Sequence, residues 1–174
     1  MRKVLIIGAG SSKTLRVPTP NAALVPQITT LDVEPRHGTD LVHDLNALPW
    51  PAEDNAFDEV HAYEVLEHLG QQGDAISFFD HFGEIWRILR PGGYLAGSVP
   101  GWDSMWAWGD PSHRRVINEG SFTYLDQTQY AKQIGVTAMT DFRSIWTRDF
   151  ECVAMERVGE QLYFLLRAHK PARR

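Results

Sequence analysis

Cysteine is nearly absent from this chain, since Cys152 is the only one among 174 residues. A single cysteine excludes an internal disulfide and is compatible with a reducing compartment. Long apolar runs are lacking too. The first one spans only residues 4–7 before glycines interrupt it, which is too short for a signal-peptide core or a membrane span. We therefore expect a cytoplasmic protein that does not enter a membrane.

Net positive charge is also lacking. The formal net charge of −5 at pH 7 argues against a general nucleic-acid-binding surface. Basic residues gather only in residues 167–174, which we expect to form a solvated tail. With 43% apolar and 22% charged residues, and with no internal repeat, the chain can bury one full-sized core. We expect residues 1–174 to form a single domain.

The clearest pattern lies between residues 57 and 100. Residues 57–65 combine an apolar run with a following polar turn, which predicts a strand that leads into a helical turn. Asp74 is suited to cap a helix whose apolar side chains recur at steps of three and four. The Pro-Gly-Gly of residues 91–93 predicts the end of that helix, and residues 94–99 predict a second strand. A strand, a crossover helix and a strand form a parallel pair.

The N-terminal strand, residues 2–7, leads directly into the turn Gly8-Ala9-Gly10. Glycines let a backbone adopt positive φ and approach a ligand closely, although a plain tight turn would explain them equally well. Three prolines exclude a long helix in residues 13–27, where we expect a loop with at most a short helical piece near residues 21–25.

Two aspartates follow the next expected strands. Asp32 ends the strand at residues 28–33, and Asp44 follows the short strand at residues 39–43. A carboxylate at the position of Asp32 can accept hydrogen bonds from both ribose hydroxyls of a nucleoside laid across the sheet edge. The alternative is a turn-forming aspartate before Pro35.

The last third of the chain has a different character. An aromatic insertion, residues 101–120, holds three of the six tryptophans. Residues 121–135 predict a helix, and residues 150–158 and 161–168 predict a terminal β-hairpin. The tryptophans of the segment Trp102–Trp108 can form an acceptor pocket or lid, cover the core, or make a dimer contact that supports a homo-oligomer. We favour the two structural roles over the pocket.

Taken in order, these motifs resemble the class I S-adenosylmethionine-dependent methyltransferases. The compact form also resembles small methyltransferase-like proteins of phage genomes. The order and spacing of the motifs, over roughly residues 3 to 100, carry the resemblance. The motifs are Gly8-Ala9-Gly10, Asp32, residues 43–49 (HDLNALP), residues 57–60 (FDEV), residues 64–68 (EVLEH) and residues 89–93 (LRPGG).

The resemblance implies an α/β fold with a doubly wound, mostly parallel sheet, an antiparallel C-terminal strand hairpin, and S-adenosylmethionine as cofactor. It implies that the glycine turn packs against the methionine part of the cofactor and that the residues after the next three strands bind the rest. The implied cofactor residues are Gly8, Ala9 and Gly10 at the methionine part, Asp32 at the ribose, Asp44 and the Leu45 amide at the adenine, and Tyr63 and Glu64 at the sulfonium end.

Two histidines are further candidates. His113 lies in a stretch, residues 110–115, that resembles one near the active-site mouth of these enzymes, and we take it as the candidate general base, with a polar loop clamp as the alternative. His68 follows Glu64 by one turn, so a metal pair is conceivable. In the family this turn serves packing and local hydrogen bonding, and we predict no metal site.

The sequence also departs from the family pattern. Ile6 stands where the family has an acidic residue, Ser12 replaces the third glycine, and the chain begins at the first strand. These departures motivate an alternative function, a non-catalytic binding or scaffold protein on a degenerate methyltransferase fold. A nicotinamide-dependent oxidoreductase is less well supported, because Lys13 replaces the third glycine of G-x-G-x-x-G and a Tyr-x-x-x-Lys pair is absent.

The methyl acceptor is not defined by the sequence. The Pro-Pro-Tyr signature of DNA amino-methyltransferases is absent after the fourth strand, where residues 63–66 read Tyr-Glu-Val-Leu. We therefore do not expect methylation of DNA amino groups, and proteins, lipids, sugars and metabolites remain open as acceptors.

Overall fold

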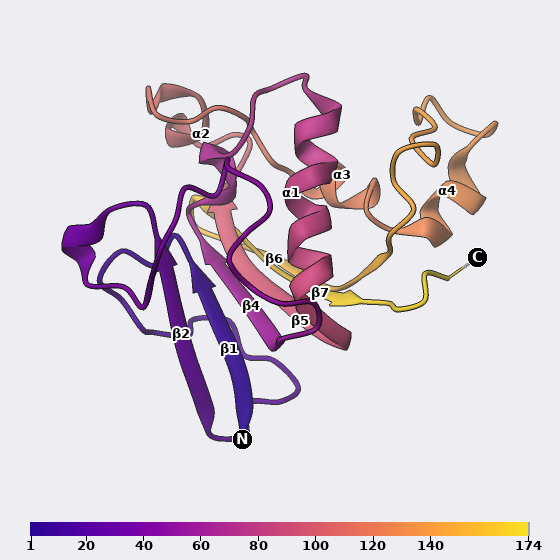
Figure 1. Cartoon of the computed structure of the whole chain (residues 1–174). Coiled ribbons are helices and arrows are strands. Elements are labelled where there is room, and N and C mark those ends of the chain that lie inside the picture. The colour runs from indigo at the N-terminus through magenta and orange to yellow at the C-terminus, as the bar shows by residue number, and fades with distance from the viewer. Residues whose placement is uncertain (174) are drawn as a thin grey trace.

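The computed structural model describes residues 1–173 and joins seven strands into one sheet, in the order β3-β2-β1-β4-β5-β7-β6 (Figure 1). Strands β1 to β5 run parallel, and β7 is antiparallel to both β5 and β6. This arrangement confirms the expected fold class, including the C-terminal hairpin. The strands are β1 (Arg2–Ile7), β2 (Pro26–Asp32), β3 (Leu41–Val42), β4 (Phe57–Tyr63), β5 (Leu89–Pro100), β6 (Phe150–Val158) and β7 (Gln161–Ala168).

One long helix, α1 (Ala75–Ile88), connects β4 to β5 and lies across one face of the sheet (Figure 1). Asp74 caps it as expected, because its side chain accepts a hydrogen bond from the Ser77 amide. Within residues 1–173, no helix has both the length and the apolar character to cross a membrane. The remaining helices are short: η1 (Pro35–His37), η2 (Leu66–His68), α2 (Met105–Gly109), α3 (Glu119–Thr123) and α4 (Gln127–Gln133).

Two local predictions were wrong in detail. The chain enters β5 directly after α1, and residues 91–93 lie in an irregular part of that strand, where Gly92 has φ of 75°. The helix expected over residues 121–135 is divided into α3 and α4, because Asp126 caps α4 by accepting from the Thr128 amide. Residues 13–25 form a loop with turns near residues 21–25, in agreement with the expectation of a loop with at most a short helical piece.

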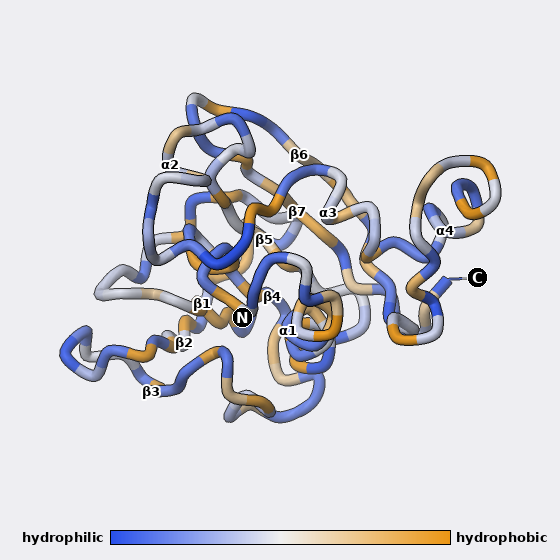
Figure 2. The backbone as a smooth tube through the Cα atoms, turned by 90° about the horizontal axis from the view of Figure 1, so that it is seen from above, coloured by the Kyte–Doolittle hydropathy of each residue, from blue (hydrophilic) through white to orange (hydrophobic). Residues whose placement is uncertain are grey.

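The main core lies between the sheet and α1. Phe79, Phe82 and Ile85 of α1 pack in one apolar cluster with alternate residues of the strands, such as Leu5 and Val60. Viewed from above, the hydrophobic segments follow the central strands, and the connecting loops are mostly hydrophilic (Figure 2). This face therefore has the helix-on-sheet packing that the sequence periodicity predicts.

The opposite face of the sheet has a different cover. The crossovers from β1 to β2, β2 to β3 and β3 to β4 contain no α-helix. A small apolar cluster of Val4, Ile6 and Ala9 packs there against Leu15 from the loop after β1, and against Ile28 of β2. Ile6, which replaces the acidic residue of the family pattern, is thus a packing residue beneath this loop.

A buried polar network also joins the loop to this face. Glu59 of β4 is fully buried, forms an ion pair of 2.7 Å with Arg2 of β1, and accepts a hydrogen bond from the Thr19 hydroxyl. Tyr63 accepts hydrogen bonds from the backbone amides of residues 16 and 17, at 2.7 and 3.1 Å. These contacts satisfy the polar groups that burial of a loop would otherwise leave unpaired.

His61 connects the two halves of this network. Its Nδ1 atom lies 2.7 Å from the Tyr63 hydroxyl, and its Nε2 atom lies 2.9 Å from the Glu59 carboxylate. The Tyr63 oxygen already accepts from two amides, so its proton is directed to Nδ1 of His61. The ring therefore accepts at Nδ1 and donates at Nε2, and all three side chains on this face of β4 are paired.

Residues 167–173 do not form the solvated tail that we expected for residues 167–174, of which Arg174 lies outside the described residues. Arg173 donates to Asp149 at 2.7 Å and to Asp126 at 2.9 Å. Lys170 lies 4.2 Å from the centre of the Trp86 ring and donates to Asn55 at 2.7 Å. The prediction was wrong because buried carboxylates and an aromatic face elsewhere in the chain bind these cations, which the local composition does not reveal.

Replacing Glu59 by Gln should destabilise the protein by about 3 kcal/mol at pH 7, because it leaves Arg2 buried without its counter-charge. Burial alone would raise the pKa of Glu59, but hydrogen bonds from His61, Thr19 and Arg2 lower it to about 2. The wild-type protein should therefore lose this stabilisation as the pH falls from about 4.5 to about 2. Urea unfolding followed by tryptophan fluorescence measures both effects. Glu53→Gln, an exposed change of the same charge, is the control, and equal losses in both variants would contradict the assignment.

Candidate active site

The glycine turn after β1 lies at the carboxyl end of the parallel strands, and its two glycines have different roles. Both have positive φ, 58° at Gly8 and 53° at Gly10. A Cβ atom on Gly8 would lie 2.3 Å from the Val65 side chain, so this glycine permits packing against the segment after β4. A Cβ atom on Gly10 would meet no atom within 4 Å. Gly10 therefore exposes bare backbone to open space at the edge of the sheet.

Asp32 lies at the end of β2, next to this turn. One carboxylate oxygen accepts from the Gly10 amide at 2.8 Å, and the other accepts from the Glu34 amide at 2.9 Å, with the His37 ring 3.2 Å away. Burial opposes ionisation, but these amide contacts hold the pKa of Asp32 below its ordinary value. Asp32 is therefore an ionised acceptor fixed against the glycine turn. Its place at the end of β2 is the one that we expected, and its contact with ribose hydroxyls stays a prediction.

The loop after β3 carries Asp44 and Leu45. Asp44 is exposed, and one of its oxygens accepts from the Asn46 amide at 2.9 Å. Leu45 is buried, and its carbonyl accepts from the Trp50 indole at 2.9 Å. The Asn46 side chain accepts from the Gly70 amide at 2.8 Å, which fixes this loop beside the segment after β4. The structure thus places the residues after β3 at the same edge as Asp32.

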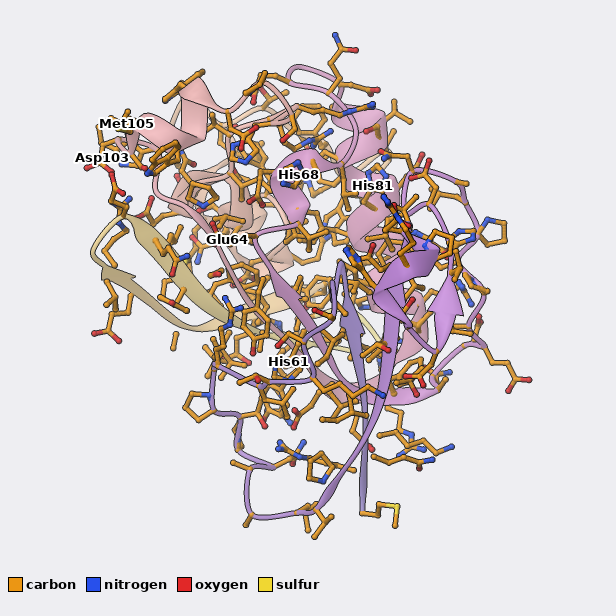
Figure 3. The ribbon with its side chains drawn as sticks, turned by 90° about the vertical axis from the view of Figure 1, so that its left-hand side faces the viewer. His61, Glu64, His68, His81, Asp103 and Met105 are labelled. Carbon is orange, nitrogen blue, oxygen red and sulfur yellow. The ribbon has the colours of Figure 1, made fainter. Side chains whose placement is uncertain are left out.

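The two residues at the end of β4 point in different directions. Glu64 has φ of 53°, donates its amide to the Ser98 carbonyl, and accepts from the Ser98 hydroxyl at 2.7 Å. Its side chain therefore stays at the carboxyl edge. Tyr63 belongs to the buried network on the other face, so its side chain does not lie with Glu64. Figure 3 shows Glu64 and His68 at one end of the sheet, and His61 further along β4. Strand alternation was the available signal for Tyr63.

A cluster that the sequence did not predict lies beside Glu64. It contains Glu67 and His68 of η2 together with His113, and one donor atom from each lies within 4.8 Å of the others. The Arg114 and Arg115 amides both donate to the Glu67 carbonyl, at 2.8 and 3.1 Å. These backbone contacts bring His113 beside two residues that lie much earlier in the chain, which local periodicity cannot show.

Glu67 is unusual among the buried acids. Its side chain is 2% exposed, and within residues 1–173 neither carboxylate oxygen has a hydrogen-bond partner. The Nε2 atom of His113 lies 3.9 Å from Oε1 of Glu67 and 3.8 Å from Oδ2 of Asp110. Burial raises the pKa of Glu67 to about 8. His113, the candidate general base, thus faces two carboxylates.

A cavity of about 540 Å³ opens over this cluster. Its wall combines acidic and aromatic side chains from η2, α2 and the turn between β6 and β7, among them Glu64, Glu67, Trp106 and Glu160. Trp106 donates to Glu160 at 3.1 Å. The three tryptophans of the insertion, Trp102, Trp106 and Trp108, are 54%, 54% and 71% exposed. They do not cover the core, and their roles in a pocket, a lid or a dimer contact stay predictions.

Replacing Glu67 by Gln tests the electrostatic state of this carboxyl group. Because the pKa of Glu67 in the folded protein is raised to about 8, the wild-type protein should lose stability as the pH rises from about 4.5 to about 8. From pH 4 to pH 8.5, the free energy of unfolding of the Gln variant should increase by about 2 to 4 kcal/mol relative to that of wild type. Urea unfolding in the presence of a chelator measures this difference. Glu53→Gln is the control, and parallel pH profiles for wild type and Glu67→Gln would refute the raised pKa.

Solved structures of low sequence identity share the fold. One is a chain of the complex between the Haloferax volcanii Trm112 methyltransferase activator and a methyltransferase, with a TM-score of 0.62 and 16% identity over 97% of this chain and 83% of that one. Another is an S-adenosylmethionine-dependent methyltransferase from Archaeoglobus fulgidus, with a TM-score of 0.58 and 12% identity over 95% and 86%.

A third is the Burkholderia thailandensis 1,6-didemethyltoxoflavin-N1-methyltransferase with bound 1,6-didemethyltoxoflavin and S-adenosylhomocysteine. It has a TM-score of 0.56 and 18% identity over 97% of this chain and 71% of that one. No curated protein matches the sequence significantly. The model of the methyltransferase domain matches residues 5–97, which is more than half of the chain. The motifs, the strand order and this match together show that the chain belongs to the class I S-adenosylmethionine-dependent methyltransferase family.

Proposed function

We propose that the protein binds S-adenosylmethionine at the carboxyl edge of β1 to β4 and transfers its methyl group to an acceptor that enters the cavity over η2. The observation that carries this proposal is the 2.8 Å contact between the Gly10 amide and Asp32. It joins an open glycine turn to an ionised carboxylate at the edge where open α/β sheets bind nucleosides. When bound, S-adenosylmethionine supplies an electrophilic methyl group.

The residues at this edge fit the nucleoside part of the cofactor. An ionised carboxylate has about four acceptor positions, and amides take two of them in Asp32. The His37 ring, whose side chain is 41% exposed, makes a third contact that a ligand can replace. Asp32 can therefore still accept hydrogen bonds from ribose hydroxyls. The open space over Gly10 lets a ligand approach the backbone at that residue.

The loop after β3 fits the adenine. Asp44 uses one oxygen for the Asn46 amide and is exposed, so it can also accept from an exocyclic amino group. The buried side chain of Leu45 fixes the backbone beside it, which keeps its amide at a constant place for a ring nitrogen. Gly8, Ala9 and Glu64, which follows β4, then face the methionine part.

The acceptor side of the proposed site is the cavity next to Glu64. Such a site has to align an acceptor atom with the methyl group, exclude water, and remove a proton where the acceptor carries one. His113 lies in the cavity wall, with its Nε2 atom 3.9 Å from the Glu67 carboxyl group and 3.8 Å from that of Asp110. We retain His113 as the candidate proton acceptor, and the class of acceptor stays open.

Calorimetric titration with S-adenosylmethionine and S-adenosylhomocysteine should show binding near the micromolar range, about −8 kcal/mol. Asp32→Ala and Asp44→Ala should each weaken this binding by about 1 to 3 kcal/mol, because each removes an acceptor of ligand hydrogen bonds. Asp80→Ala, an exposed change on α1, should leave the affinity unchanged.

The two aspartate variants differ in what a negative result means. Asp32 also holds the glycine turn, so thermal melting must show that Asp32→Ala is folded. Asp44 makes only local contacts to Asn46 and is the cleaner test. Unchanged affinity in both variants, or equal binding of NADH, would exclude the proposed cofactor site.

A further inference from the structure

We propose that Glu67, His68 and His113 form a binding site for a first-row divalent metal ion such as Zn²⁺, with free coordination positions that face the cavity. Two imidazoles and one carboxylate are a donor set that suits such ions. All three donor side chains belong to this chain, and the site does not require bound S-adenosylmethionine.

The distances are close to those that a metal site needs. Donor atoms bound to one ion at about 2.0 to 2.2 Å lie roughly 3 to 4 Å from one another. The three donor atoms lie within 4.8 Å of each other, and the contact between His113 and Glu67 is 3.9 Å. The donor atoms therefore have to approach one another from at most 4.8 Å to this range. The backbone contacts between η2 and residues 114 and 115 hold the two segments in place.

Glu67 provides the independent observation that a ligand belongs here. Its carboxylate is almost completely buried, is directed into the cluster, and has no hydrogen-bond partner within residues 1–173. A buried carboxylate without partners is costly, and buried charges are normally paired or coordinate metals. A residue with only a packing role at this position would not need a carboxyl group.

His68 is oriented in the manner of a metal ligand. Its Nδ1 atom lies 3.2 Å from the Ser112 carbonyl. A carbonyl can only accept, so Nδ1 carries the proton, and Nε2 is left with a free lone pair. Histidines that bind metals typically donate their other ring nitrogen to a carbonyl or carboxylate in this way. The contact fixes the tautomer that ligation requires.

The surrounding charge also favours a cation. Glu64, Asp110 and Glu160 line the same cavity, and Oδ2 of Asp110 lies 3.8 Å from Nε2 of His113. These carboxylates lower the electrostatic energy of a divalent ion and can supply further oxygen ligands. The remaining coordination positions open into a cavity of about 540 Å³, as in catalytic metal sites, which keep a position for water or substrate.

The test is calorimetric titration of the full chain with ZnCl₂, after chelator treatment and removal of the chelator, in the absence of S-adenosylmethionine. Wild type should bind one ion, and Glu67→Gln, His68→Ala and His113→Ala should each weaken binding at least tenfold. His169→Ala is the matched control, because His169 pairs with Glu151 away from the cluster and should keep wild-type affinity. Co²⁺ should give a visible d–d absorption band in wild type that the three cluster variants lose.

Thermal melting without metal checks that each variant folds. His68 is only partly buried, so its variant decides the matter if Glu67→Gln or His113→Ala proves unstable. Absence of Zn²⁺ binding in wild type, or binding that the three cluster variants retain, would overturn the site. Because the titration contains no cofactor, loss of S-adenosylmethionine binding with intact Zn²⁺ binding would count against the proposed function alone.

Discussion

The buried ion pair between Arg2 and Glu59 is the contact on which the loop-covered face of the sheet depends. Prolines prevent a helix from forming in the crossover from β1 to β2, so a loop covers that face. The backbone amides of a buried loop need hydrogen-bond acceptors, which apolar side chains cannot provide. The strands therefore present Glu59, His61 and Tyr63 to the loop, and a polar network replaces the packing of a helix. The other face is left free for α1 and the apolar core.

This division of the two faces also determines what reaches the carboxyl edge. Alternation along β4 directs Tyr63 into the network, and the left-handed conformation of Glu64 turns the next side chain toward Ser98. The parallel order of β3, β2, β1 and β4 brings Asp32 and the residues after β3 to the same edge as Glu64. The site is therefore a consequence of topology, with each residue placed by the end of its own strand.

Features set by local chemistry were predictable from the sequence. The cap at Asp74, the glycine turn and the position of Asp32 follow from backbone preferences of a few consecutive residues. The direction of Tyr63, the ion pairs of Arg173 and the meeting of Glu67 with His113 depend on partners far along the chain. Composition and periodicity contain no information on such partners. Ile6 illustrates both cases. Its apolar character was visible in the sequence, but its packing contact with Leu15 was not.

Glu67 differs from the other buried acids in its lack of hydrogen-bond partners within residues 1–173. Asp32 accepts from two amides, Glu59 pairs with Arg2 and His61, and Asp149 pairs with Arg173. The chain thus supplies hydrogen-bond or ion-pair partners for each of these three buried carboxylates. Glu67 is buried like these residues, but its oxygens have no hydrogen-bond partner in the described part of the chain. Their neighbours are His113, at 3.9 Å, and His68. A carboxylate left in this state destabilises the fold unless a bound cation or substrate completes its coordination. The missing partner of Glu67 is therefore best sought among ligands that enter through the cavity.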